Sequence, residues 1–302
     1  SNVAIGASAA GAFIGSYAVA IGREALRDAN HASTADGTVA IGTGSLAALT
    51  SGAKNIAIGY QALQHSDTAQ ENIAIGYQAM SDQNVGGGGN AADSDRNIAI
   101  GVSSMAGAWA DAKSENNVAI GSYTMQGAMN DADYNTVVGD ASGNAITSGS
   151  SNTALGASAG LALTEGNFNV LIGYQAGDAL TTMTHNTAVG TDALSGSSLV
   201  DQCVIIGSQA GAGAITAAAD GSVGIGYAAL GALTSGAGNV AVGYQAMDTT
   251  TTGQKNVAVG YTALSAGTGN SYNVAIGWES MLLANGADEN TAIGQTALRA
   301  LT

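Results

Sequence analysis

Three histidines, His31, His65 and His185, are the side chains best suited to act as general bases near neutral pH. They lie in turn-rich segments, at unrelated distances from the nearest repeated glycine described below. None has a carboxylate or hydroxyl group recurring at a matching position, as a Ser-His-Asp triad would need. We therefore expect no hydrolytic site and no enzymatic activity.

Acidic residues gather in segment 81–96, which reads SDQNVGGGGNAADSDR. Asp82, Asp93 and Asp95 could offer oxygen ligands to Ca²⁺, but the segment lacks the spacing of an EF-hand loop. We favour a solvated loop, as we do for the Asp-x-Asp pattern at 131–133, and expect no cofactor. The single cysteine, Cys203, excludes an internal disulfide. We interpret it as a small buried residue, with a reactive thiol as the alternative.

Aromatic residues follow a recurring glycine directly, and such exposed rings could stack on sugars. We favour the alternative, a ladder of rings joining neighbouring chain segments. The members are Tyr60, Tyr77, Tyr174, Tyr227, Tyr244, Tyr261 and Trp278. Our candidate receptor contacts are Trp109, Asp93, Asp95, Tyr134 and Trp278, although burial beneath a loop would remove Trp109 from this set.

The recurring glycine ends the phrase Asn-apolar-Ala-apolar-Gly, of which the chain has seventeen copies, several of them with substitutions. Ten of the sixteen intervals between these glycines are 17 residues, and the others are 16, 18, 19, 20, 20 and 25. A spacing that returns to one value after each excursion indicates loops inserted into a fixed frame. The repeat glycines are Gly6, Gly22, Gly42, Gly59, Gly76, Gly101, Gly121, Gly139, Gly156, Gly173, Gly190, Gly207, Gly226, Gly243, Gly260, Gly277 and Gly294.

The apolar residues before each glycine predict a short strand. Val or Ile alternates with Ala, as in Ile56-Ala57-Ile58, so Val/Ile and Ala should point to opposite faces. We expect Val and Ile to fill the coil interior. We expect the Ala face, exemplified by Ala57, Ala74, Ala99 and Ala119, to seat neighbouring chains. The following residues, such as Tyr60–Leu63, predict either a second short strand or one helical turn, and the remainder is rich in turn-forming residues.

A 17-residue unit is short for a helix pair and suits one coil of a parallel β-solenoid. We predict an all-β chain of about 17 coils that forms a single continuous domain over residues 1–302, cut from a longer chain. Asn occupies the position four before the repeat glycine in thirteen copies. This pattern predicts either a hydrogen-bonded amide ladder or a residue that suits the turn into the strand. The ladder residues include Asn55, Asn72, Asn97, Asn152, Asn169, Asn239, Asn256 and Asn273.

The charge of the chain limits the classes of molecule that it could bind. The formal net charge is −15 with only 7 Lys and Arg residues, which argues against nucleic acid and against anionic bilayer surfaces. No apolar run is long enough to span a membrane, so we expect no membrane insertion in this segment. The 45 glycines never lead into the Gly-Lys-Ser/Thr of a phosphate-binding loop.

The phrase Asn-Val-Ala-Ile-Gly, at 2–6, 117–121 and 273–277, resembles the head repeats of YadA-like trimeric autotransporter adhesins and repeats of phage tail-fibre proteins. The resemblance implies a left-handed β-roll, a homotrimer and an extracellular location on a bacterial surface or virion fibre. It also implies an outside that binds a host-surface protein or glycan. We expect a rigid structural and adhesive rod with contacts in loops 81–96, 106–116 and 126–134. A self-assembling extracellular filament and a polysaccharide-degrading phage spike remain the alternatives.

Overall fold

The computed structural model describes residues 1–11, 16–27, 36–82, 94–109, 112–197, 199–216, 219–284 and 286–300. The chain divides into two compact units, residues 1–152 and 153–302. The described residues form seventeen strands of three residues, each ending directly before a repeat glycine. In the first unit these are β1 (Val3–Ile5), β2 (Val19–Ile21), β3 (Val39–Ile41), β4 (Ile56–Ile58), β5 (Ile73–Ile75), β6 (Ile98–Ile100), β7 (Val118–Ile120) and β8 (Thr136–Val138). In the second they are β9 (Thr153–Leu155), β10 (Val170–Ile172), β11 (Thr187–Val189), β12 (Val204–Ile206), β13 (Val223–Ile225), β14 (Val240–Val242), β15 (Val257–Val259), β16 (Val274–Ile276) and β17 (Thr291–Ile293).

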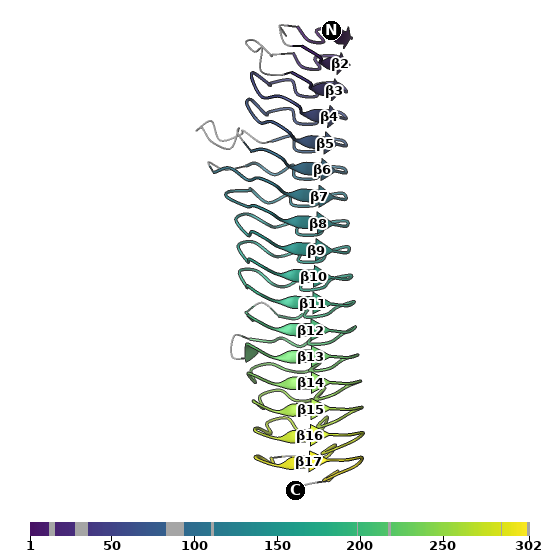
Figure 1. Cartoon of the computed structure of the whole chain (residues 1–302), viewed down its shortest axis with the longest axis vertical. Helices are drawn as coiled ribbons and strands as arrows, with labels where there is room; N and C mark the ends of the chain where they lie inside the picture. Colours follow the sequence, from purple (N-terminus) through teal and green to yellow (C-terminus); the bar gives the residue numbers. More distant parts are fainter. Residues whose placement is uncertain are drawn as a thin grey trace. The chain divides into compact units, whose positions relative to one another are not determined.

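Within each unit, every strand pairs in parallel with the next strand along the chain, as the successive rungs of Figure 1 show. The register is constant: Ile56 pairs with Ile73 across 17 residues, and Ile73 pairs with Ile98 across 25. The extra residues of long intervals therefore leave the frame unchanged. This arrangement confirms the predicted parallel β-solenoid with a period of about 17 residues.

The predicted orientation of the strands is wrong. The middle residue of the strand faces the interior, and Ala57, Ala74, Ala99 and Ala119 are all fully buried. The flanking Val and Ile residues are half-buried or exposed and form the outer surface. The interior is filled instead by a Leu or Met that arrives after the glycine, such as Leu63. Where this Leu or Met occupies the interior of the coil, the middle strand residue has room for only the methyl group of Ala.

The segment after the glycine is neither a strand nor a helical turn. Its second and fourth residues have left-handed backbone angles, as in Gln61 (φ 54°) and Leu63 (φ 51°). L-residues in this region cost about 1–2 kcal/mol each. Hydrogen bonds to adjacent coils hold them there: the Gln61 N–H donates to Thr43 O at 2.9 Å, and the Leu63 N–H donates to Ala79 O at 3.0 Å.

The repeat glycine is required by both conformation and space. Gly76, at φ 145°, lies in a region that only glycine adopts readily, and its N–H donates to Ile58 O at 2.8 Å. A Cβ on Gly76 would lie 2.7 Å from the carbonyl carbon of Gly101 and closer still to its oxygen. Stacked backbones therefore come too close at this corner for any side chain.

Candidate attachment surface

The outward Val and Ile residues create an apolar face, one strand wide, on each unit. This Val/Ile face consists of the first and third residues of the strands, which are Val or Ile except at Thr136, Thr153, Leu155, Thr187 and Thr291. Exposure reaches 37% at Ile120 and Ile276 on inner strands and 68% at Ile293 on the last strand. Apolar surface repeated on consecutive strands is unusual for a protein that functions alone in water.

The asparagines four before the repeat glycine are buried and join adjacent coils. The backbone N–H of Asn72 donates to Asn55 Oδ1 at 3.0 Å, and the N–H of Asn97 donates to Asn72 Oδ1 at 2.8 Å. Asn256 and Asn273 repeat this contact in the second unit, at 2.9 Å. The amide nitrogen also donates to a carbonyl that precedes the next strand, as from Asn55 Nδ2 to Ala69 O at 2.7 Å. Each side chain therefore satisfies buried backbone groups of the following coil.

A second column, made of aspartates and not predicted from the sequence, lies two residues before the asparagines. Asp95 Oδ1 accepts the Gln70 N–H at 2.8 Å, and Asp133 Oδ1 accepts the Glu115 N–H at 2.6 Å. In the second unit, Asp288 Oδ1 accepts the Ser271 N–H at 2.7 Å. The signal was an Asp-x-Asn spacing, as in Asp95-Arg96-Asn97, but Ser, Gln and Ala occupy the same position elsewhere.

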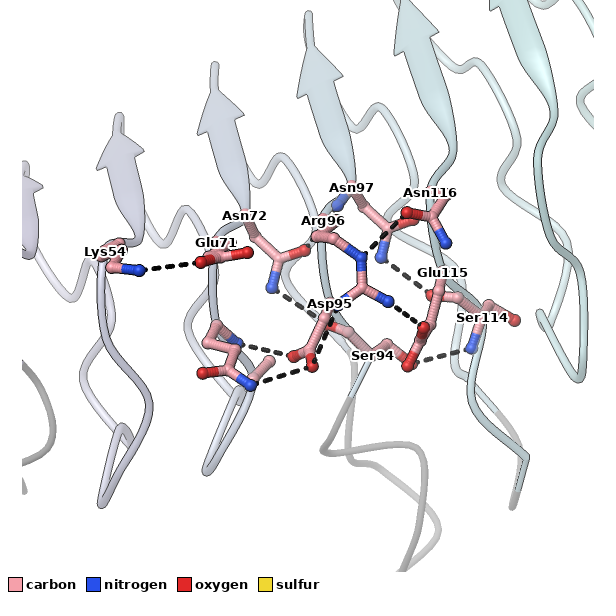
Figure 2. Close-up of polar contacts among 12 residues, drawn as sticks. Lys54, Glu71, Asn72, Ser94, Asp95, Arg96, Asn97, Ser114, Glu115 and Asn116 are labelled. Carbon is pink, nitrogen blue, oxygen red and sulfur yellow. Dashed lines mark hydrogen bonds and ion pairs between the residues drawn. The ribbon is translucent and has the colours of Figure 1, made fainter.

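Figure 2 shows these columns around Asp95, Arg96 and Asn97. Lys54 Nζ lies 2.9 Å from Glu71 Oε1, and this hydrogen bond lowers the pKa of the Glu71 carboxyl. Arg96 bonds Asn116 Oδ1 at 2.9 Å and pairs with Glu115. Exposed pairs of this kind contribute little free energy. Lys54, Glu71 and Arg96 lie directly before the asparagines of three consecutive coils, and their alternating charge favours one register between these coils.

Most of the predicted rings stack on their neighbours. Ring centroids lie 5.2 Å apart for Tyr60–Tyr77 and 5.1 Å apart for both Tyr227–Tyr244 and Tyr244–Tyr261. The favoured ladder interpretation therefore describes these residues. The inner ring, Tyr244, has a neighbour on each face, so its faces are not open to a ligand.

The candidate receptor contacts fall into three groups. Tyr134 is 64% exposed and Trp278 is 45% exposed, so both are available. Trp109 is 2% exposed, with its Nε1 donating to Met105 O at 3.2 Å, and Asp95 is 8% exposed. Both are unsuited to receptor contact because neighbouring coils cover them. Asp93 lies outside the described residues.

The remaining reactive side chains have structural surroundings. His65 Nδ1 lies 2.8 Å from Ser81 O and 3.2 Å from Asp82 Oδ1, while His185 stacks on Phe168 at 5.0 Å. His31 lies outside the described residues. Burial raises the pKa of the Cys203 thiol to about 11, so it stays protonated at neutral pH.

Two kinds of feature are absent from the described ranges of the chain. Within those ranges, three or more His, Cys, Asp or Glu side chains nowhere gather to hold a metal ion. The same ranges hold no helix whose length and hydropathy would let it cross a bilayer. No protein-family model matches the sequence, and no curated protein matches it either.

Proposed function

We propose that this chain is a structural and adhesive segment of an extracellular fibre, in which identical chains associate through their Val/Ile faces. The observation that carries the proposal is the outward Val/Ile face, present on coil after coil. Association would remove that apolar area from water, which stabilises the complex by about 25 cal/mol per Å² of area buried. The resemblance to trimeric adhesin heads makes three copies the expected number, and a bacterial surface or virion fibre the expected location.

The insertions support a role in attachment. The longest interval contains its extra residues between Asp82 and Ser94, after the inward Met80 and before the ladder residue Asn97. Asp82 and Ser94 both lie outside the strands that carry the Val/Ile face. Copies packed through that face would leave these loops free, and loops on a rigid frame are common binding elements. A host-surface protein or glycan is the proposed target.

Sedimentation equilibrium tests the association. We expect a discrete species at three times the chain mass of 29.3 kDa over a wide concentration range. The variant Ile100→Asp/Ile120→Asp places two charges on the Val/Ile face of β6 and β7 and should dissociate the trimer. Its matched control, Ala108→Asp/Ala128→Asp, adds the same charges to exposed positions of the same coils and should stay trimeric.

Circular dichroism distinguishes dissociation from unfolding. A variant that keeps its β-spectrum while becoming monomeric supports the proposed interface. A wild-type chain that is monomeric at high concentration would refute the association. An open series of sizes that grows with concentration would favour a filament over a trimer.

A further inference from the structure

In the described part of the chain, Tyr174 and Trp278 follow a repeat glycine but do not stack on another ring, and only Tyr174 has a small residue on both sides. Tyr174 is 54% exposed, against 43% for the ladder residue Tyr244. Its neighbours in this column are Ala157 and Thr191, since the N–H groups of Gln175 and Asp192 bond the carbonyls of Ala157 and Tyr174. Both neighbours are too small to cover a phenol ring. Tyr174 therefore has a ring at a ladder position without the stacking that accounts for the ladder rings.

Three polar residues lie at neighbouring positions of the same coil and the next one. The side chains of Gln175 and Asp192 lie one residue further along two adjacent coils, and neither bonds another described residue. Thr191 presents an exposed hydroxyl beside them. An amide, a carboxylate and a hydroxyl supply both donors and acceptors. Adjacent coils lie about 4.8 Å apart, which is close to the width of one sugar ring.

We propose that Tyr174, with Gln175, Thr191 and Asp192, binds a neutral pyranose unit of a polysaccharide. The apolar face of the sugar stacks on the phenol at the position that a ladder neighbour would occupy, over Ala157 or Thr191. The sugar hydroxyls exchange hydrogen bonds with the three polar side chains. The net charge of −15 favours neutral over anionic sugars. This inference deepens the proposed attachment function by naming a ligand class and a site.

Titration with cellohexaose and N-acetylchitohexaose, followed by saturation-transfer NMR and calorimetry, tests the site. At least one probe should bind wild-type protein, and Tyr174→Ala should weaken its binding about tenfold, the loss of one aromatic contact. Tyr174→Phe should keep most of the affinity. Tyr244→Ala removes a ring of similar position from a ladder and should bind like wild type, as should Trp278→Ala.

The site is refuted if neither probe binds, or if Tyr174→Ala binds as tightly as wild type. A loss on Trp278→Ala without a loss on Tyr174→Ala would refute it too, by moving the contact to Trp278. Sedimentation of every variant keeps this result separate from the fibre proposal. Sugar binding by a monomer would refute the trimer and leave the site intact, whereas a trimer that binds neither probe would do the reverse.

Discussion

Swapping a large and a small side chain between two neighbouring interior positions offers the sharpest test of the packing. Leu171 lies at the middle of β10, where most strands have Ala, and the residue six further on is Gly177. A Cβ on Gly177 would lie 2.7 Å from Leu171 Cδ2 and 2.9 Å from Leu180 Cδ1. The next coil has the opposite arrangement, with Ala188 on the strand and Leu194 at φ 58°. The two arrangements should therefore be interchangeable only as pairs.

The single variants should both be destabilised. Leu171→Ala leaves a cavity and should cost about 2–5 kcal/mol. Gly177→Leu overpacks the interior for about 1–3 kcal/mol and adds about 1–2 kcal/mol for its left-handed backbone. In the double variant the new leucine fills much of the space of the old one, so the backbone cost and the loss of the Leu171 contact beside Gly160 remain. We expect a coupling free energy of about 2 kcal/mol or more in favour of the pair.

Guanidinium unfolding followed by circular dichroism measures the four species at one protomer concentration. The control pair combines Leu171→Ala with Gly211→Leu, because a Cβ on Gly211 would contact Ile205 and not Leu171. Its two effects should add. A coupling below about 0.5 kcal/mol for Leu171 with Gly177 would show that the two positions do not share space, and the packing argument would fail.

Four further predictions use the same frame. Gly243→Ala should prevent folding or cost on the order of 4 kcal/mol, because its Cβ would lie 2.6 Å from the Gly260 carbonyl carbon; soluble yield and melting temperature check this. Asn256→Ala should cost about 2–4 kcal/mol in denaturant titrations through unsatisfied buried groups, whereas Cys203→Asn, which continues the ladder, should gain about 1 kcal/mol. Burial raises the pKa of the Asp248 carboxyl, so the ionised form is disfavoured in the fold. The stability of the fold should therefore rise as pH falls from the raised pKa towards 3.8. The melting temperature of Asp248→Asn should not show this rise, and at pH 7 it should be higher than that of wild type. Deletion of residues 84–91 restores an interval of 17 and should shift the melting point little, because β5 and β6 already pair in register; a loss of β-spectrum would contradict the fixed frame.

The spacing of the glycines was sufficient to predict the fold. In a solenoid, each coil repeats the same backbone contacts, so any residue that the backbone demands must recur at the coil length. Gly76 shows why this signal is strong, since a Cβ there would overlap the next coil. Asn72 recurs for a related reason, because its amide satisfies buried groups that every coil has. The aspartate column was missed because a serine hydroxyl can replace the carboxylate, as Ser150 does for the Asp133 N–H at 2.9 Å.

The site predictions were weaker because exposure depends on contacts between coils. Trp109 lies in an irregular segment that has no equivalent in other coils. Its backbone N–H donates to Asp82 O of the preceding coil at 3.3 Å. Trp278 follows a repeat glycine and is exposed, whereas the segment around Trp109 offers no repeat position from which its exposure could be predicted. Tyr174 and Tyr244 likewise occur in the same phrase, Gly-Tyr-Gln-Ala. They differ only in whether the coils before and after carry another ring.

The inward face of the strand could have been recognised from the sequence by comparing its copies. Where the middle strand residue is larger than Ala, the residue six positions later is Gly. Where the strand has Gly224, that later position has Leu230. Such reciprocity indicates two side chains that share one interior volume, because close packing allows only one of them to be large. The alternation of Val and Ala shows that the strand has two faces, but it does not show which face is inside. The reciprocal sizes of the middle strand residue and the residue six positions later do show it. The three large-to-Gly pairs are Val137 with Gly143, Leu171 with Gly177, and Ile205 with Gly211.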